Sequence, residues 1–494
     1  VAQRTRIVDF MACGHQNLTI GTLVRWTPDF GHVAKWGSRS NGESKSRNDA
    51  CEVGPHTTMK PTRRPVEHGL QESARTRMEG RRAVRRSLSL ILLEGAPSGV
   101  IQRVIETFFT PFALVLKATS PQIGLLTAVP SLLAALAQLA APRLVDALGS
   151  RRRLLLASCV AGVVLWLPIA LLPWIFGPTA VWWLLVLATL AVVVFQLPAP
   201  AWGSWVPQLV PVRRLGTFLA RRGTIGFAFS VGAALVIGRW LDLMHNHIYV
   251  AFMAVFLLAS AMRFTCFFLY YNAYEPPSPG KPSPSTAALA FVRTLRSSNI
   301  GHFIGYTTAL NFAVAVAGPF FTVFMLKDLH FSYTRMVALQ LMNLAGFAVG
   351  LYFWGKLADR RGNVRVLKLA TPLAAALPLL WLVTRYYPWL MVAEFVGALG
   401  WSGWQLGASN FVYECSHPED RSRAVAYFNA SNGVGVFFGA LLGGFLAPVL
   451  PHLFSYSMLT LFLMSGLLRI STMGLLVPFV REVRQAPKAA VARQ

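Results

Sequence analysis

Three ionisable residues lie inside long apolar stretches of the chain, where little water is available to solvate a charge. Arg103 and Glu106 are three residues apart, so on a helix they share one face and can neutralise each other. Glu394 lies roughly 8 Å, by the helix rise, from the start of another apolar stretch. A charge in hydrocarbon is costly unless it is paired or faces water, so these residues indicate either a substrate site with a coupling proton on Glu106 or Glu394, or a plain structural ion pair.

A second group of candidates lies in the segment GWSGWQLGASN, residues 400–410. Trp401 and Trp404 offer flat indole faces, and Gln405 offers an amide, which together suit a largely apolar ligand. Asn311 is another polar side chain in an apolar stretch, and it either lines the same path or hydrogen-bonds between helices. We expect Trp401, Trp404 and Gln405 to contact a substrate, with Asn311 as a further candidate.

Two more buried cations, Arg263 and Arg469, fall at similar depth in two apolar stretches. Their long side chains favour a contact that stabilises the helix bundle, or an extended conformation that reaches the membrane surface. We therefore predict structural roles for both.

The elements that hold these residues are predicted to be membrane helices. Of the 494 residues, 54% are hydrophobic and 13% are charged, too few polar groups for a soluble globule of this size. About twelve stretches approach the length of about 20 residues that a helix needs to cross a bilayer. The expected spans are 88–116, 123–144, 154–176, 181–205, 224–243, 248–271, 300–326, 333–357, 366–384, 389–412, 424–450 and 454–480.

One charged turn between apolar stretches occurs twice, as APRLVDALGSRRRLL at 141–155 and as WGKLADRRGNVRVL at 354–367. Each copy places an Asp beside Arg residues and a Gly. Copies about two hundred residues apart are typical of transporters built from two similar membrane halves. We predict an all-α membrane protein in which twelve transmembrane helices form two pseudo-symmetric six-helix bundles.

The domain boundaries follow from composition. Residues 275–299 are rich in Pro and Ser, as a linker would be, and separate a bundle at 87–274 from a second at 300–480 and a tail at 481–494. Residues 1–86 are basic, lack a sustained apolar period and are predicted to be disordered. An alternative hypothesis is that translation starts near Met78, which the intact mass of the natively expressed product would decide.

The placement of charge predicts the orientation in the membrane. After residue 87, the loops and tail on one side hold 22 Lys and Arg residues, those on the other side hold 5, and 3 lie within helices. Cations favour the cytoplasmic side, so both termini are expected in the cytoplasm, in a plasma or bacterial inner membrane. This distribution argues against nucleic acid as a partner.

The sequence contains no motif for catalysis or for a cofactor. It has no phosphate-binding ATP loop, no HExxH zinc motif and no nucleophile with an evident base. The five cysteines have no CxxC spacing, so neither a zinc site nor a disulfide framework is expected. We predict a carrier without metal or cofactor, not an enzyme.

From about residue 88 to 484 the chain resembles the major facilitator superfamily of secondary transporters. The family loop between helices 2 and 3 reads approximately G-x-L-a-D-r-x-G-r-k, with a degenerate copy between helices 8 and 9. The second copy here fits through Gly355, Leu357, Asp359, Arg360 and Gly362, whereas the first has Pro142 for the leading Gly and keeps Leu144, Asp146, Gly149 and Arg151. The resemblance implies two bundles around a central cavity lined by helices 1, 4, 7 and 10, with helices 3, 6, 9 and 12 outside.

The repeated acidic residues are candidates for a conformational latch. An anion near a helix amino terminus or a neighbouring Arg stabilises one packing of the two bundles. The alternative, that these loops only follow the cytoplasmic preference of cations, explains the Arg residues but not the repeated Asp. The candidate latch residues are Asp146, Arg151, Gly355, Asp359, Arg360 and Gly362.

The function predicted from these features is secondary transport of a small molecule, a metabolite or a drug-like compound, by alternating access between the two bundles. The partners are then a small-molecule substrate, membrane lipid and, through Glu106 or Glu394, protons. Two alternatives stay open: an uncoupled facilitator, and a nontransporting membrane receptor or assembly protein on the same fold.

Overall fold

The structure is a computed structural model that describes residues 64–276, 299–415, 421–453 and 456–476. By its internal contacts the chain divides into Val1–His68 and Gly69–Gln494, and the fold below is that of the second unit. The predicted tail at 481–494, most of the linker and residues 1–63 lie outside the described residues.

The first half of the fold begins with a helix that starts at Arg64, within the segment predicted to be disordered. Its elements are α1 (Arg64–Val115), α2 (Ser120–Leu148), α3 (Arg151–Ala170), α4 (Leu172–Phe176), η3 (Gly177–Thr179), α5 (Ala180–Gln196), α6 (Ala199–Leu209), α7 (Val212–Leu243), η4 (His245–His247) and α8 (Ile248–Tyr271).

The second half repeats this plan after the linker. Its elements are α10 (Asn299–Ala317), α11 (Phe320–Val323), η6 (Phe324–Asp328), α12 (Tyr333–Arg361), α13 (Asn363–Val383), α14 (Tyr387–Cys415), α15 (Arg421–Leu446) and α16 (Ser457–Leu476).

Three of the predicted spans are interrupted where the sequence places proline. The span expected at 154–176 divides at Leu171 into α3 and α4, and the span at 181–205 divides next to Pro198 into α5 and α6. The span at 300–326 breaks at Gly318 and Pro319, before α11 and the π-helical turn η6. Proline has no N–H for the helical ladder and its ring crowds the preceding turn, which explains these breaks.

Eleven spans in the described ranges are long and apolar enough to cross a membrane. The twelfth long helix, α14, is not among them, because Glu394 and the run of Gly, Ser, Trp and Gln at 400–405 reduce its hydropathy. The all-α membrane architecture is confirmed. The helix in which we expected substrate contacts thus lacks the continuous apolar stretch that the other eleven spans contain.

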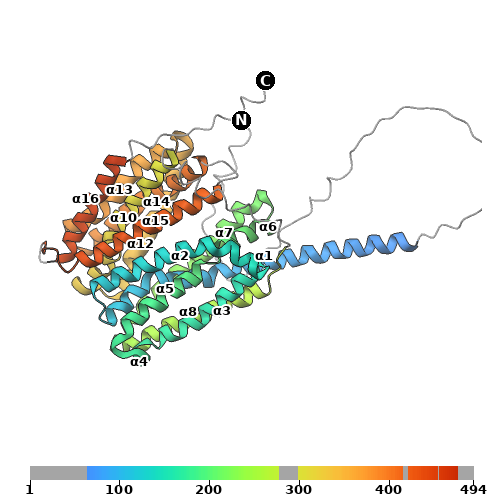
Figure 1. The fold of residues 1–494 in the computed structure, drawn as a ribbon, viewed down its shortest axis with the longest axis horizontal. Helices are drawn as coiled ribbons and strands as arrows, with labels where there is room; N and C mark the ends of the chain where they lie inside the picture. The colour runs from blue at the N-terminus through green and yellow to red at the C-terminus, as the bar shows by residue number, and fades with distance from the viewer. Residues whose placement is uncertain (1–63, 277–298, 416–420, 454–455, 477–494) are drawn as a thin grey trace, which may run out of the picture. The chain divides into compact units, whose positions relative to one another are not determined.

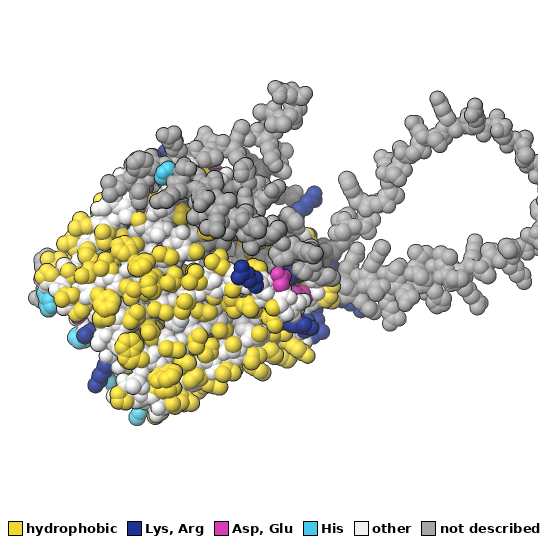
Figure 2. All heavy atoms as spheres, viewed as in Figure 1, with side chains coloured by type: hydrophobic (Ala, Val, Ile, Leu, Met, Phe, Trp, Pro, Cys, Tyr) yellow, Lys and Arg dark blue, Asp and Glu magenta, His cyan; other side chains and the backbone are white. Residues whose placement is uncertain are grey.

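The outer surface of the helices is apolar. On the face shown in Figure 2, hydrophobic side chains cover the middle, while the charged and His side chains lie near its two ends. On α3, for example, Val160, Val164 and Leu167 recur at helical spacing and are about half exposed. A surface of this kind is solvated by lipid tails and not by water.

The same helix pairs recur in both halves. In the first half α2 packs on α5 and α3 on α8, and in the second α12 packs on α14 and α13 on α16. Figure 1 shows α2, α3, α5 and α8 running side by side along their lengths. The halves join through two further pairs, α2 with α15 and α7 with α12.

Glycines allow the closest of these approaches. A Cβ added at Gly99 of α1 would lie 2.2 Å from the carbonyl oxygen of Gly226 on α7. In the second half a Cβ at Gly443 of α15 would lie 2.0 Å from the carbonyl oxygen of Val316 on α10. Small residues let membrane helices gain dispersion contacts through backbone approach. The contact at Gly99 sets the positions of α1 and α7, which carry Glu94, Arg103, Glu106 and Arg222.

The two halves are tied together at the end of the bundle opposite the charged turns. The Asp242 carboxylate, near the end of α7, accepts hydrogen bonds from the backbone N–H groups of Tyr333 and Thr334 at 2.7 and 2.9 Å. These are the first residues of α12, so a negative charge meets the positive end of a helix dipole. At the same end Gly124 of α2 packs against Gly444 of α15, with 3.0 Å from a Cβ at Gly124 to the Gly444 Cα.

We expect Gly99→Ala to lower the thermal stability of the detergent-solubilised protein, because α1 and α7 must separate to admit the methyl group. Overpacking of this kind costs about 1–3 kcal/mol. Gly232→Ala on α7 is the matched control, since a Cβ there meets no atom within 4 Å. Equal melting temperatures for the two variants would contradict the close packing.

We expect Asp242→Asn to weaken the contact between the halves at this end by about 1 kcal/mol, because the charge at the amino terminus of α12 is lost. The measurement is the spin-label distance between Asn246 and Tyr386, two exposed positions in the loops after α7 and α13. The distribution should broaden toward longer distances. Asp328→Asn, an acid on η6 with no hydrogen bond or ion pair to other described residues, should leave the distribution unchanged, and a similar shift in both variants would argue against the contact.

Candidate functional site

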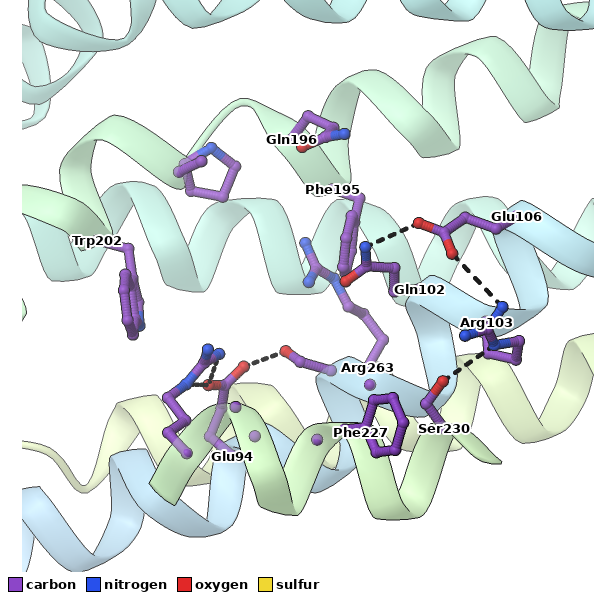
Figure 3. Close-up of a pocket in the computed structure, with 18 of the residues that line it drawn as sticks. Glu94, Gln102, Arg103, Glu106, Phe195, Gln196, Trp202, Phe227, Ser230 and Arg263 are labelled. Atoms are coloured by element: carbon purple, nitrogen blue, oxygen red, sulfur yellow. Dashed lines mark hydrogen bonds and ion pairs between the residues drawn. The ribbon is translucent and has the colours of Figure 1, made fainter. Parts of the chain in front are cut away.

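A cavity of about 460 Å³ lies within the first half, which we call the N-half cavity. It is bounded chiefly by α1, α5, α6, α7 and α8 (Figure 3). Its polar side chains come from several helices: Glu94, Ser98, Gln102, Arg103, Glu106, Gln196, Arg222, Ser230 and Arg263. Ionisable side chains are costly to bury in a membrane, so a cavity that gathers them is a candidate functional site.

One ion pair in this cavity joins α1 to α7. Arg222 Nη2 lies 2.6 Å from Glu94 Oε2, and Ser98 also donates to this carboxylate. Glu94 is 1% exposed, so its charge depends on these partners. The Arg222 guanidinium also lies over the Trp202 ring, 4.4 Å from its centroid. The charges of Glu94 and Arg222 are thus compensated within the protein.

A second ion pair is the one expected from the sequence. Arg103 Nη1 lies 3.8 Å from Glu106 Oε2, and Arg103 Nε donates to Ser230 Oγ at 3.0 Å. Gln102 donates to the other Glu106 oxygen at 2.8 Å. The Glu106 side chain is 51% exposed, so it is solvated while the Arg103 side chain is largely covered.

A second cavity of about 430 Å³, the C-half cavity, begins where the first ends. Arg103, Glu106 and Leu344 line both cavities. Beside them, Thr107 of α1 donates to Gln340 of α12 at 2.8 Å, so the halves also make a polar contact here. The Arg103–Glu106 pair therefore lies at the junction of the two cavities.

Glu394 is the principal charged group of the C-half cavity. Its carboxylate accepts hydrogen bonds from Asn343 Nδ2 at 2.7 Å and from Trp381 Nε1 at 3.2 Å. Arg469 lies close enough to interact electrostatically, but its Nη1 donates to the Ala374 carbonyl at 3.0 Å instead of to the acid. Within the described residues Glu394 makes no direct ion pair.

The predicted aromatic contacts divide between two places. Trp401 lines the C-half cavity and stacks on Trp404 with ring centroids 4.5 Å apart, whereas Trp404 is buried behind it. Gln405 is exposed and Asn311 donates to the Thr307 carbonyl, and neither lines the N-half or the C-half cavity. The structure thus brings Arg103, Glu106, Glu394 and Trp401 together, but not Gln405 or Asn311.

The two charged turns have a common backbone geometry. Gly149 and Gly362 adopt φ values of 65° and 88°, a region that favours glycine, at the ends of α2 and α12. Gly355 lies inside α12, where a Cβ would meet no atom within 4 Å. Conformation thus explains the glycine at each turn, while no close contact requires Gly355.

The acidic latch candidates lie on the exposed surface of the two charged turns. Asp146 and Asp359 are exposed and have no hydrogen bond or ion pair from their carboxylates to other described residues, and Arg360 is exposed as well. Arg151, in contrast, is buried: its Nε lies 3.3 Å from Glu275 Oε1 and its Nη2 donates to Gln208 at 3.0 Å. It ties the start of α3 to the ends of α6 and α8.

Two cavity residues, Arg263 and Arg469, lie on helices that the family resemblance places outside the central cavity. Arg263 and Arg469 are 5% and 3% exposed, so neither side chain reaches the membrane surface, and each lines one of the cavities. The sequence analysis did not identify Glu94, Arg222 or Trp202 as site residues. The pairing of Glu94 with Arg222, 128 positions apart, leaves no local sequence signal.

Several solved structures share the fold. The nucleoside transporter NupG superposes with a TM-score of 0.65 at 12% identity, over 80% of this chain and 99% of that one. A bacterial homologue of the human lysosomal transporter Spinster gives 0.60 at 14% identity, over 82% and 99%. A D-xylose–proton symporter gives 0.60 at 13% identity, over 81% and 98%. At these identities the likeness is one of fold.

No curated protein matches the sequence significantly. The family model of the Major Facilitator Superfamily, however, matches the chain twice, at residues 96–308 and 302–493. The two matches correspond to the two helical halves described above. With a transporter fold and a cavity in each half, the chain is a multi-pass membrane protein that belongs to the Major Facilitator Superfamily, a family of transporters and not of enzymes.

Proposed function

We propose that the protein is a secondary transporter that moves a small molecule by alternating access of the two halves around the junction at Arg103 and Glu106. The observation that carries the proposal is the pair of cavities, one in each half, that share these two residues. A substrate bound at the junction contacts both halves, so a change in their relative tilt moves its access from one side of the membrane to the other.

The contacts between the halves support a particular conformation. Asp242 and the Gly124–Gly444 contact close the end away from the charged turns. At the turns themselves, Asp146 and Asp359 have no side-chain partner among the described residues. In this proposal the latch formed by Asp146, Asp359 and Arg360 engages when the bundle closes at the turns, with Arg151 as its structural anchor.

The loop charges support a membrane orientation. The excess of Lys and Arg on the side of the charged turns favours the cytoplasm for that side and for both termini, in a plasma or bacterial inner membrane. The closed end then faces outward, and the conformation is open toward the cytoplasm.

Proton coupling is the second part of the proposal. Glu394 lies in a cavity and has no direct ion pair among the described residues, and Glu106 is held by a 3.8 Å contact with Arg103 and a hydrogen bond from Gln102. Either carboxylate can take a proton without leaving a tightly paired cation uncompensated. The D-xylose–proton symporter of the same fold is a precedent for coupling, and transfer to this chain is part of the proposal.

The experiment begins with a thermal-shift screen of metabolites and drug-like compounds on the purified full chain, because a ligand of the folded state raises its stability. Uptake of a stabilising compound into proteoliposomes under an imposed proton gradient then tests transport. Binding without flux would support a nontransporting receptor and overturn the proposal.

We expect Glu394→Gln to abolish gradient-driven accumulation while it preserves exchange of labelled for unlabelled substrate, because exchange does not require net proton movement. Glu106→Gln should act similarly if it shares the proton, and should also weaken binding because Arg103 loses its partner. Trp401→Ala should reduce affinity with the coupling intact. If gradient-driven accumulation is unchanged in both Gln variants, neither acid couples transport to protons, and the result supports an uncoupled facilitator.

A further inference from the structure

We infer that the N-half cavity binds the anionic group of the substrate through Arg263, and that the substrate class is a small monocarboxylate with a flat apolar body. This inference rests on the proposed transport function and adds the substrate class to it. It depends on the charge balance of the cavity, on the contacts of Arg263 and on a difference between the two halves.

The charged residues that line the N-half cavity include one more cation than anions. Among the charged residues that line the cavity, Glu94 is paired with Arg222 and Glu106 with Arg103. Arg263, on α8, has no carboxylate within 4 Å in the described part of the chain. A guanidinium that is 5% exposed within the membrane requires a counter-charge, so a bound anion is the expected partner.

The contacts of Arg263 hold the side chain but do not neutralise it. Its Nη2 donates to Ser158 Oγ at 2.7 Å and lies 3.4 Å from the carbonyl oxygens of Ser158 and Val194. The guanidinium lies over the Phe195 ring, 5.2 Å from the centroid (Figure 3). Its Nη1 has no hydrogen-bond partner among the described residues. A fixed guanidinium with free N–H groups is suited to a carboxylate.

The second half contains a matching cation with an acid nearby. Arg469 corresponds to Arg263 in the internal repeat, and Glu394 lies close to it. The helix equivalent to α14 in the first half is α5, and α5 contains no acidic residue. The first half therefore keeps the cation and lacks the acid, and the substrate carboxylate takes its place.

The aromatic side chains that line the cavity indicate the chemistry of the part of the ligand beyond its carboxylate. Phe195, Phe227 and Trp202 line the same cavity, and Phe227 is 44% exposed. Aromatic faces favour a flat apolar body by offset stacking. A volume of about 460 Å³ accommodates a molecule of one or two rings. One uncompensated cation matches a single negative charge better than a doubly charged phosphate.

The test is a thermal-shift titration of the purified full chain with benzoate, nicotinate and indole-3-acetate, each compared with its neutral amide. At least one carboxylate should stabilise the protein more than its amide does. Arg263→Gln should weaken apparent affinity for that carboxylate by about tenfold or more, as expected for loss of a charge-assisted hydrogen bond. The amide should be unaffected.

A second variant tests the charge without removing the arginine. Ser158→Asp places a carboxylate beside Arg263 and should abolish the preference for the acid over the amide, whereas Ser158→Asn should retain it. Arg213→Gln, which removes an exposed cation from α7, should also retain it. If Arg263→Gln fails to fold, the Ser158 pair decides the outcome.

Equal stabilisation by acids and amides, or a preference that persists in Ser158→Asp, would overturn the inference. Flux measured in proteoliposomes separates it from the proposed function. If carboxylates bind through Arg263 but are not transported, the anion site is supported and the proposed transport function is contradicted. If a neutral compound is transported and acids are not preferred, the proposed transport function is supported and the anion site is contradicted.

Discussion

The free-energy cost of a charge in hydrocarbon constrains the whole arrangement of this protein. Along the middle of the bundle each acid has a compensating neighbour: Glu94 has Arg222, Glu106 has Arg103, and Glu394 has an amide and an indole. These partners come from different helices in the first and third cases, so the charges also fix which helices are adjacent. The cavities exist where the charges are, because water and substrate are the only other groups able to solvate them.

Close helix packing makes this placement possible. The glycines that bring α1 against α7 leave Glu94 and Arg222 within hydrogen-bonding distance, whereas larger residues would separate them. Both halves contain close glycine contacts between equivalent helices, but their ionisable residues differ. The repeat thus supplies a symmetric scaffold, and the individual ionisable side chains make the two cavities chemically different. A carrier needs this combination, since similar halves can exchange conformations while only one of them holds a particular ligand group.

Much of the fold could be predicted from the sequence, and less of the site. Apolar length and the repeated charged turn identified the helices and the two halves, because both signals are local or periodic. The prolines beside the helix breaks, Pro198 and Pro319, are a local signal too. The predicted spans did not take them into account. Arg103 and Glu106 were found because they are neighbours on one helix. Neither the pairing of Arg222 with Glu94 nor the exposure of Gln405 on α14 could be predicted, because the rotation of a helix about its axis depends on packing against distant segments. The roles of these site residues remain predictions.

The contact between Asp242 and the start of α12 has a genetic consequence. The carboxylate binds the backbone N–H groups of Tyr333 and Thr334, not their side chains. Almost any residue at 333 or 334 supplies the same donors, and only proline lacks them. These hydrogen bonds between α7 and α12 therefore depend on the codon for Asp242 and hardly at all on the codons for their donors. Random mutation of α12 would rarely break them, so changes in the preferred conformation should arise at position 242 far more often than at its binding partners.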